Sequence, residues 1–184
     1  IEGPAGPFLL ETNELGLRGE LPPEEGDWTL ALGCSTTLGW GVEESEAWPA
    51  QLSDRIGEPV INAGQPGWST EQAVGHVDEW LELKPTRVII GYIVRDAQAS
   101  SRPDAEAQPT PWWARTSIAR LIRQAGRSEA ASAYAVGSPE QTRVPPDIYR
   151  ENLARLIEMS TGAEVILLSF PQVEPLTPWE EVQD

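Results

Sequence analysis

The sequence predicts an α/β protein with a doubly wound, mostly parallel sheet and helices on both faces. Short apolar runs alternate along the chain with longer segments of helical periodicity. The most strand-like run, RVIIGYIV at 87–94, is apolar throughout, which favours a central parallel strand covered on both faces. Sheets of this class place their sites at the carboxyl ends of the strands, so functional residues are expected directly after the strands.

Four runs have the length and apolar character of buried strands, namely 28–33, 59–64, 87–94 and 163–170. Helical patterns lie between them at 43–57, from Ser69 to about Leu81, at 113–126 and at 145–162. Ser69 and Gln72 have the spacing of a capping box at the start of the second helix. Gly57 and Gly162 are typical helix stops. The order of elements is that of a doubly wound sheet.

The chain divides into two parts by composition. Residues 1–27 carry many Gly, Pro and acidic residues, which indicates an extended N-terminal arm and linker. Residues 28–184 are predicted to form one α/β domain, because a chain of 184 residues with 40% hydrophobic content can build one sizeable core.

Charge and cysteine content exclude several classes of partner. Lys and Arg total 13 against 29 Asp and Glu, a formal net charge of -16, so we expect no nucleic-acid partner. Cys34 is the one cysteine, and no Cys/His cluster has metal-ligand spacing, so neither a metal nor another cofactor is expected. No apolar run approaches the roughly 20 residues that span a bilayer, so no membrane insertion is expected either.

Both ends of the chain fit the boundaries of a fragment. The sequence starts at Ile1 and stops at Asp184, just after a plausible helix start. The cellular compartment is therefore left open.

The stretch LALGCSTTLGWGV at 30–42 places Ser35 just after the first strand. There its hydroxyl and amide can face the crevice at the sheet edge, a layout suited to acyl transfer. Gly64, after the second strand, can supply a second amide, because a residue without Cβ lets backbone approach a substrate closely. The structural alternative is an ordinary turn in which Ser35 caps the next segment.

Nucleotide or flavin binding is an alternative function for the same turn. The patterns G-x-x-x-x-G-K-[ST] and G-x-G-x-x-G are absent, and Lys84 is the single lysine. A flavodoxin-like binder would have the predicted sheet but no phosphate loop here, so this interpretation is not favoured.

The chain resembles the SGNH (GDSL-type) ester hydrolases. LALGCSTTLGWGVEESEAWPAQL is similar to the family's first block, VINAGQPGWST to its second, and KPTRVIIGYIVRDA occupies the place of its third. ETNELGLRG and DIYRENLARLIEMSTGAEVILLSFP also resemble segments of bacterial members, so the resemblance covers nearly the whole chain. It implies a three-layer, flavodoxin-like fold and an ester hydrolase that needs no cofactor.

The resemblance also implies roles for particular residues. Ser35 is the implied nucleophile, and its amide and Gly64 are the implied oxyanion donors. Cys34 replaces the family's usual Asp, and Arg95 stands where its Asn would donate to the oxyanion. Arg95 can still stabilise negative charge, although pairing with Asp96 or another acid is the structural alternative.

The general base that the resemblance implies has no matching segment in this sequence. The family's Asp-x-x-His block normally follows one more strand and loop after AEVILLSFP, so the catalytic His and Asp are expected beyond residue 184. His76, the one histidine, is interpreted as a partly buried helix residue. Two explanations stay open: a fragment of an enzyme, or a domain that has lost triad chemistry.

Residues near the strand ends suggest a substrate crevice. Cys34, Trp40, Trp68 and Asp96 are its candidate lining, and Trp112 and Trp113 follow the long loop. Tryptophan more often fills cores, which is the alternative for each of them. The function hypothesis is a serine esterase acting on a small-molecule or carbohydrate ester, such as an O-acetyl group. The alternative is an inactive domain of the same fold that binds glycan or a protein partner.

Overall fold

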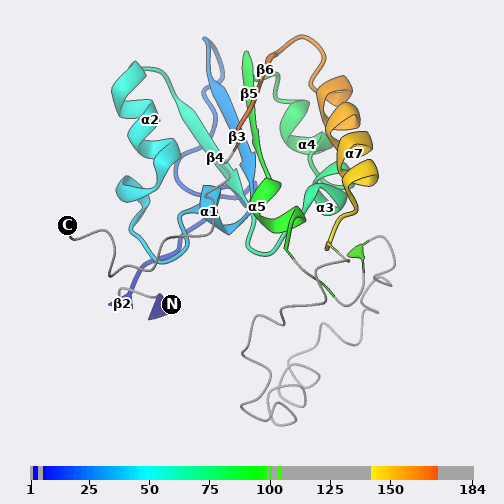
Figure 1. Ribbon diagram of the computed structural model, residues 1–184. Coiled ribbons are helices and arrows are strands. Elements are labelled where there is room, and N and C mark those ends of the chain that lie inside the picture. Colours follow the sequence, from blue (N-terminus) through cyan, green and yellow to red (C-terminus); the bar gives the residue numbers. More distant parts are fainter. Residues whose placement is uncertain (1, 4–5, 99, 101–102, 105–141, 170–184) are drawn as a thin grey trace, which may run out of the picture.

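The computed structural model describes residues 2–3, 6–98, 100, 103–104 and 142–169. Its centre is a four-stranded parallel sheet with the strand order β4-β3-β5-β6 (Figure 1). The strands are β3 (Thr29–Gly33), β4 (Val60–Gly64), β5 (Arg87–Gly91) and β6 (Glu164–Leu167). All four coincide with predicted apolar runs, and the predicted α/β class with a parallel sheet is confirmed.

Helices cover the two faces of the sheet. The main core is formed by alternate strand residues together with α3 (Thr70–Val74), α4 (Asp78–Leu81) and α7 (Pro146–Met159). Ala73, Trp80 and Leu156 are the helix residues buried in this core, together with Val77, the N-cap of α4. On the other side of the sheet, α2 (Trp48–Ile56) lies along β4 (Figure 1).

The predicted helix from Ser69 to Leu81 is in fact two short helices. α3 ends at Val74 with Gly75 as its C-cap, and α4 starts at Asp78. Glycine weakens a helix by about 1 kcal/mol relative to alanine, which makes Gly75 the natural break point. The apolar stripe survives the break, because residues of both helices pack into the same core.

Several short elements were not predicted. Single helical turns follow the first and third strands of the sheet along the chain, at α1 (Ser35–Leu38) and α5 (Ile93–Asp96). A 3-10 turn, η1 (Glu44–Glu46), precedes α2. The predicted helix at 113–126 lies outside the described residues.

Part of the N-terminal arm packs against the domain. The arm begins with the short antiparallel pair β1 (Glu2–Gly3) and β2 (Gly6–Pro7). Leu17 is fully buried in the core, and the Arg18 N–H donates to the Asn62 carbonyl at 3.0 Å. Residues 17–18 of the predicted extended arm and linker therefore pack onto the α/β domain.

Membrane-spanning helices and metal-binding clusters are both absent from the part of the chain that the structure describes. The described residues contain no helix long and apolar enough to cross a bilayer. They also contain no group of three or more His, Cys, Asp or Glu side chains that could hold a metal ion.

Candidate active site at the carboxyl edge of the sheet

Three glycines form the floor of the candidate site. β3, β4 and β5 each end in glycine at the same level, with Gly33 in register with both Gly64 and Gly91. A Cβ on Gly33 would lie 1.9 Å from Thr37 Oγ1, and one on Gly64 would lie 2.1 Å from the Leu38 backbone nitrogen. α1 therefore sits on the strand ends more closely than any residue with a side chain would allow.

This packing places Ser35 directly after the C-terminal end of the inner strand β3. Ser35 is the first residue of α1 and is partly exposed. Within the described part of the chain, neither its hydroxyl nor its amide N–H has a hydrogen-bond partner. Neither group is therefore engaged within the described residues, and the catalytic role of Ser35 stays a prediction.

Gly64 does not suit the oxyanion role that was predicted for it. Its N–H donates to Asn62 Oδ1 at 3.0 Å, and its Cα faces the backbone of α1. The missing side chain at this position makes room for α1, and the amide already has an acceptor. Gly64 therefore lets α1 pack closely on the end of β4.

Gly67, three residues later, was not singled out by sequence reasoning. It adopts a left-handed conformation with φ of 82°, and its carbonyl accepts from Arg95 Nε at 3.4 Å. Its own N–H has no partner among the residues the structure describes. The available signal was the second glycine of NAGQPG, which favours a backbone conformation with positive φ.

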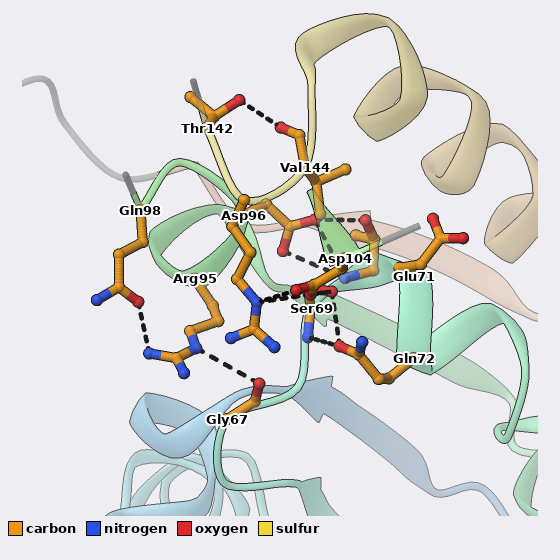
Figure 2. Close-up of polar contacts among 12 residues, drawn as sticks. Gly67, Ser69, Glu71, Gln72, Arg95, Asp96, Gln98, Asp104, Thr142 and Val144 are labelled. Carbon is orange, nitrogen blue, oxygen red and sulfur yellow. Dashed lines mark hydrogen bonds and ion pairs between the residues drawn. The ribbon is translucent and has the colours of Figure 1, made fainter. Parts of the chain in front are cut away.

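Arg95 lies beside the segment that follows β4. It belongs to α5, directly after β5, and besides Gly67 it contacts Gln98 Oε1 through Nη1 (Figure 2). This contact brings together the segments that follow β4 and β5, two of the segments that were predicted to meet at the strand ends. The predicted alternative of a pair with Asp96 is not seen, because the Asp96 carboxylate binds Thr70 instead.

Asp96 is a buried anchor and does not line an open crevice. Its side chain is 2% exposed and accepts from the Thr70 N–H at 3.1 and 3.2 Å and from the Thr70 hydroxyl (Figure 2). Burial raises the pKa of the Asp96 carboxyl to about 6, against the opposing effect of the Thr70 hydrogen bonds. Asn152 Nδ2 of α7 donates to the same Thr70 hydroxyl at 3.2 Å. This network ties α5, α3 and α7 together below the site.

A second polar cluster holds the start of α3. The Ser69 N–H donates to Gln72 Oε1 at 2.8 Å, which confirms the predicted capping box. The Ser69 hydroxyl also lies 2.6 Å from Asp104 Oδ2, and Asp104 accepts from Arg143 Nε at 2.7 and 2.6 Å (Figure 2). The segment from Gly67 to Thr70 is thus fixed from two sides.

Cys34 does not line a crevice. It is 1% exposed within the core, and its Sγ lies 3.3 Å from Thr36 Oγ1. The neighbouring Tyr92 is also buried, and burial raises the pKa of its phenol. The thiol at position 34 is therefore shielded from solvent, whereas the hydroxyl at position 35 is accessible.

The tryptophans make contacts within the protein. Trp40 is 42% exposed and packs edge-to-face on Phe8, with ring centroids 5.5 Å apart. Trp68 stacks on Trp80 at 6.0 Å and contacts His76 at 5.1 Å. Trp112 and Trp113 lie outside the described residues. The place of Trp40 and Trp68 in a substrate crevice stays a prediction.

His76 is exposed, where a partly buried position was predicted. It lies in the break before α4, because α3 ends at Val74, two residues earlier. Its Nδ1 lies 2.9 Å from the Gln72 carbonyl oxygen, and its ring packs against Trp68. These contacts give it no link to Ser35.

Solved structures resemble this chain in fold. The crystal structure of AlinE4, an SGNH-hydrolase family esterase, matches with a TM-score of 0.50 and 19% identity over 79% of this chain. This chain has the SGNH-hydrolase fold. A G-D-S-L family lipolytic protein of Desulfitobacterium hafniense DCB-2 (TM-score 0.49, 20% identity, 77% of this chain) and a lipase/acylhydrolase of Enterococcus faecalis (0.46, 21%, 77%) also match. No protein-family model and no curated protein matches the sequence.

The chain spans 56 to 60% of the length of these SGNH-fold structures. Within its SGNH fold, the free groups of Ser35 lie at the strand ends, and Arg95 lies beside Gly67. Cys34, Gly64 and Asp96 are structural parts beneath that edge.

Proposed function

We propose that this chain is the nucleophile-bearing part of a serine ester hydrolase of the SGNH type. The observation that supports this most is the unpaired, partly exposed hydroxyl of Ser35, held on a floor of three glycines at the carboxyl edge of an SGNH-type sheet. This is the position at which sheets of this class present their reactive groups.

In the proposed reaction, Ser35 Oγ attacks the carbonyl carbon of an ester. The bond to the leaving alcohol breaks, the alcohol takes a proton, and an acyl-serine remains until water hydrolyses it to the free acid. The Ser35 and Gly67 amides are the proposed oxyanion donors, with Arg95 adding positive charge nearby. Gly67 replaces Gly64 in this role because the Gly64 amide is already bonded.

The general base of the proposed reaction lies outside the described residues. It is expected in an Asp-x-x-His segment of the whole protein beyond residue 184. His76 does not serve, since its ring packs on Trp68 and its Nδ1 faces a backbone carbonyl.

Hydrolysis of an aryl acetate by the whole protein tests the proposal. Replacing Ser35 by Ala should lower kcat by roughly three or more orders of magnitude, because loss of a nucleophile leaves only binding and oxyanion effects. Ser45→Ala, at an exposed serine of the same region, is the matched control and should keep full activity. Equal rates for the Ser35→Ala protein and the parent would refute the assignment.

A carbohydrate O-acetyl ester is the finer proposal for the substrate. Release of acetate from an acetylated sugar, compared with release of butyrate from an aryl butyrate, checks it. A higher kcat/KM for the aryl butyrate would contradict a preference for acetylated carbohydrate while leaving the ester hydrolase proposal intact.

A further inference from the structure

A pocket of about 470 Å³ lies along the outer edge of β4, away from the candidate active site. Its walls are arm residues 18–23 on one side and Ala50, Ser53 and Asp54 of α2 on the other, and its floor is 59–62. Figure 1 shows α2 beside β4 at this end of the sheet. We call this pocket the β4 edge groove. Its volume is in the range of sites that hold small ligands or short chain segments.

β4 is an edge strand of the sheet, and in this groove its backbone at Val60 pairs with no other described segment on the outer side. The Asn62 carbonyl faces outward, because it accepts from the Arg18 N–H, whereas the Pro59 carbonyl faces β3 and accepts from the Thr29 N–H. Backbone groups of alternate strand residues point to the same side, so the N–H and C=O of Val60 face outward with those of Asn62. No other described segment pairs with Val60 on that side. A donor and an acceptor are therefore open at the floor of the groove.

Arg18 supplies a second donor without a partner, its buried Nε–H. Its side chain is 3% exposed and lines the groove. Nη1 donates to the carbonyls of Leu38 and Gly39 at 2.6 and 2.8 Å, and Nη2 donates to Val42 at 2.8 Å. The Nε–H, by contrast, has no acceptor in the described part of the chain. A buried donor without an acceptor is destabilising, so a ligand oxygen that reaches Nε would be stabilised.

Acidic residues at the rim of the groove determine which ligand charge is favoured there. Glu20, Glu44 and Asp54 line it and are exposed, in a chain with a formal net charge of -16. This field opposes carboxylates and phosphates, so the oxygen that meets Arg18 Nε or the Val60 N–H must be uncharged. An amide carbonyl meets this condition, and a neighbouring cation would meet the acidic rim.

We propose that the β4 edge groove binds an extended, basic peptide segment of a partner protein. The peptide backbone pairs with the open N–H and C=O of Val60, as in the addition of a strand to a sheet edge, and a peptide carbonyl accepts from Arg18 Nε. A Lys or Arg side chain of the peptide lies at the rim beside Glu20 and Asp54. The proposal does not depend on the chemistry of Ser35.

An NMR titration of the isotope-labelled protein with the peptide acetyl-Lys-Val-Lys-Val-Lys-amide tests this proposal. We expect saturable shifts of the Val60 amide and the Arg18 Nε–H, and no such shifts with the matched Glu-Val-Glu-Val-Glu peptide. Glu20→Gln and Asp54→Asn should each weaken binding by about two- to fivefold, as expected for rim charges. Glu82→Gln and Asp78→Asn remove the same charge at exposed positions outside the groove and should leave the affinity unchanged.

Four results would overturn the proposal. Shifts that do not saturate by about 1 mM peptide would show that no site exists at a useful affinity. Equal weakening by the control variants would show attraction to the acidic surface in general. Equal binding of a peptide N-methylated at alternate amides would exclude strand pairing. A Val60 amide that resists hydrogen exchange in the free protein would show that the chain fills the groove itself.

Discussion

The glycines at positions 64 and 75 differ in what surrounds them, and this difference predicts opposite effects of adding a methyl group. Gly64 has the α1 backbone 2.1 Å from the position of a Cβ, whereas the nearest atom to a Cβ on Gly75 is 3.7 Å away. Gly64→Ala must displace α1 and should lower the free energy of unfolding by about 3 kcal/mol or more. Gly75→Ala, the control, should be neutral or slightly stabilising.

Urea unfolding of both variants measures this difference. A stable Gly64→Ala protein would mean that α1 is not seated on the strand ends, and the placement of Ser35 would be wrong with it. The placement of the candidate nucleophile Ser35 therefore depends on Gly64, which packs against the backbone of α1.

Residue types alone could not separate the roles of Gly64 and Gly67. Both glycines occur in NAGQPG, and a resemblance to a motif does not show which of two nearby amides is already bonded. The deciding facts are the acceptor offered by Asn62 Oδ1 and the backbone of α1, which both come from the tertiary structure. The same holds for Asp96, whose burial depends on packing against α3.

At the level of elements, one arginine holds α1 at its C-terminal end. Arg18 donates to the carbonyls of Leu38, Gly39 and Val42, and Asn62 Nδ2 also donates to Leu38 at 3.3 Å. Because α1 begins at Ser35, this clamp fixes the helix that carries the candidate nucleophile. The ELGLRG segment of the arm is thus part of the scaffold of the site.

Arg18→Met should lower the free energy of unfolding by about 3 kcal/mol, because several buried carbonyls lose a charged donor. Arg18→Lys restores the charge but not the fork of donors, so it should recover only part of that loss. Hydrogen exchange of the Gly39 and Trp40 amides, which both donate to the Ser35 carbonyl, reports on α1 directly. It should accelerate in both variants and stay unchanged in the control Arg55→Lys on the exposed face of α2. Unchanged exchange in Arg18→Met would contradict the clamp.

The sequence allowed the strands and the long helices to be predicted, but not the single turns between them. β3, β4 and β5 are buried, β6 falls in an apolar run at the exposed edge of the sheet, and α7 is long enough to show its Pro start. α1 and α5 have four residues each, too few for a helical period to be visible. These two turns carry Ser35 and Arg95, so the parts of the fold that local patterns could not predict are the parts that shape the candidate site.

For the whole molecule, the net negative charge and the burial of Asp96 both lower the stability of the folded state as pH rises. The formal net charge of -16 favours expansion of the folded state at neutral pH, and ionised Asp96 is disfavoured by its burial. The pKa of Asp96 is raised from 3.8 to about 6, so the folded state binds its proton more tightly than the unfolded state. Stability from this group is present below the unfolded-state pKa and is lost as pH rises through the folded-state pKa.

The free energy of unfolding should therefore fall by about 2 kcal/mol through Asp96 between pH 4 and pH 6.5. Asp96→Asn is uncharged at every pH, and its amide oxygen can still accept from the Thr70 N–H, so the fall with pH should become shallower. Asp78→Asn, at an exposed aspartate, controls for the change in net charge and should keep the full slope. Urea unfolding at three pH values across this range measures all three proteins. An unchanged slope in Asp96→Asn would show that the carboxylate between α5 and α3 ionises as it would in water, and the network that joins these two helices below the site would then be open to solvent.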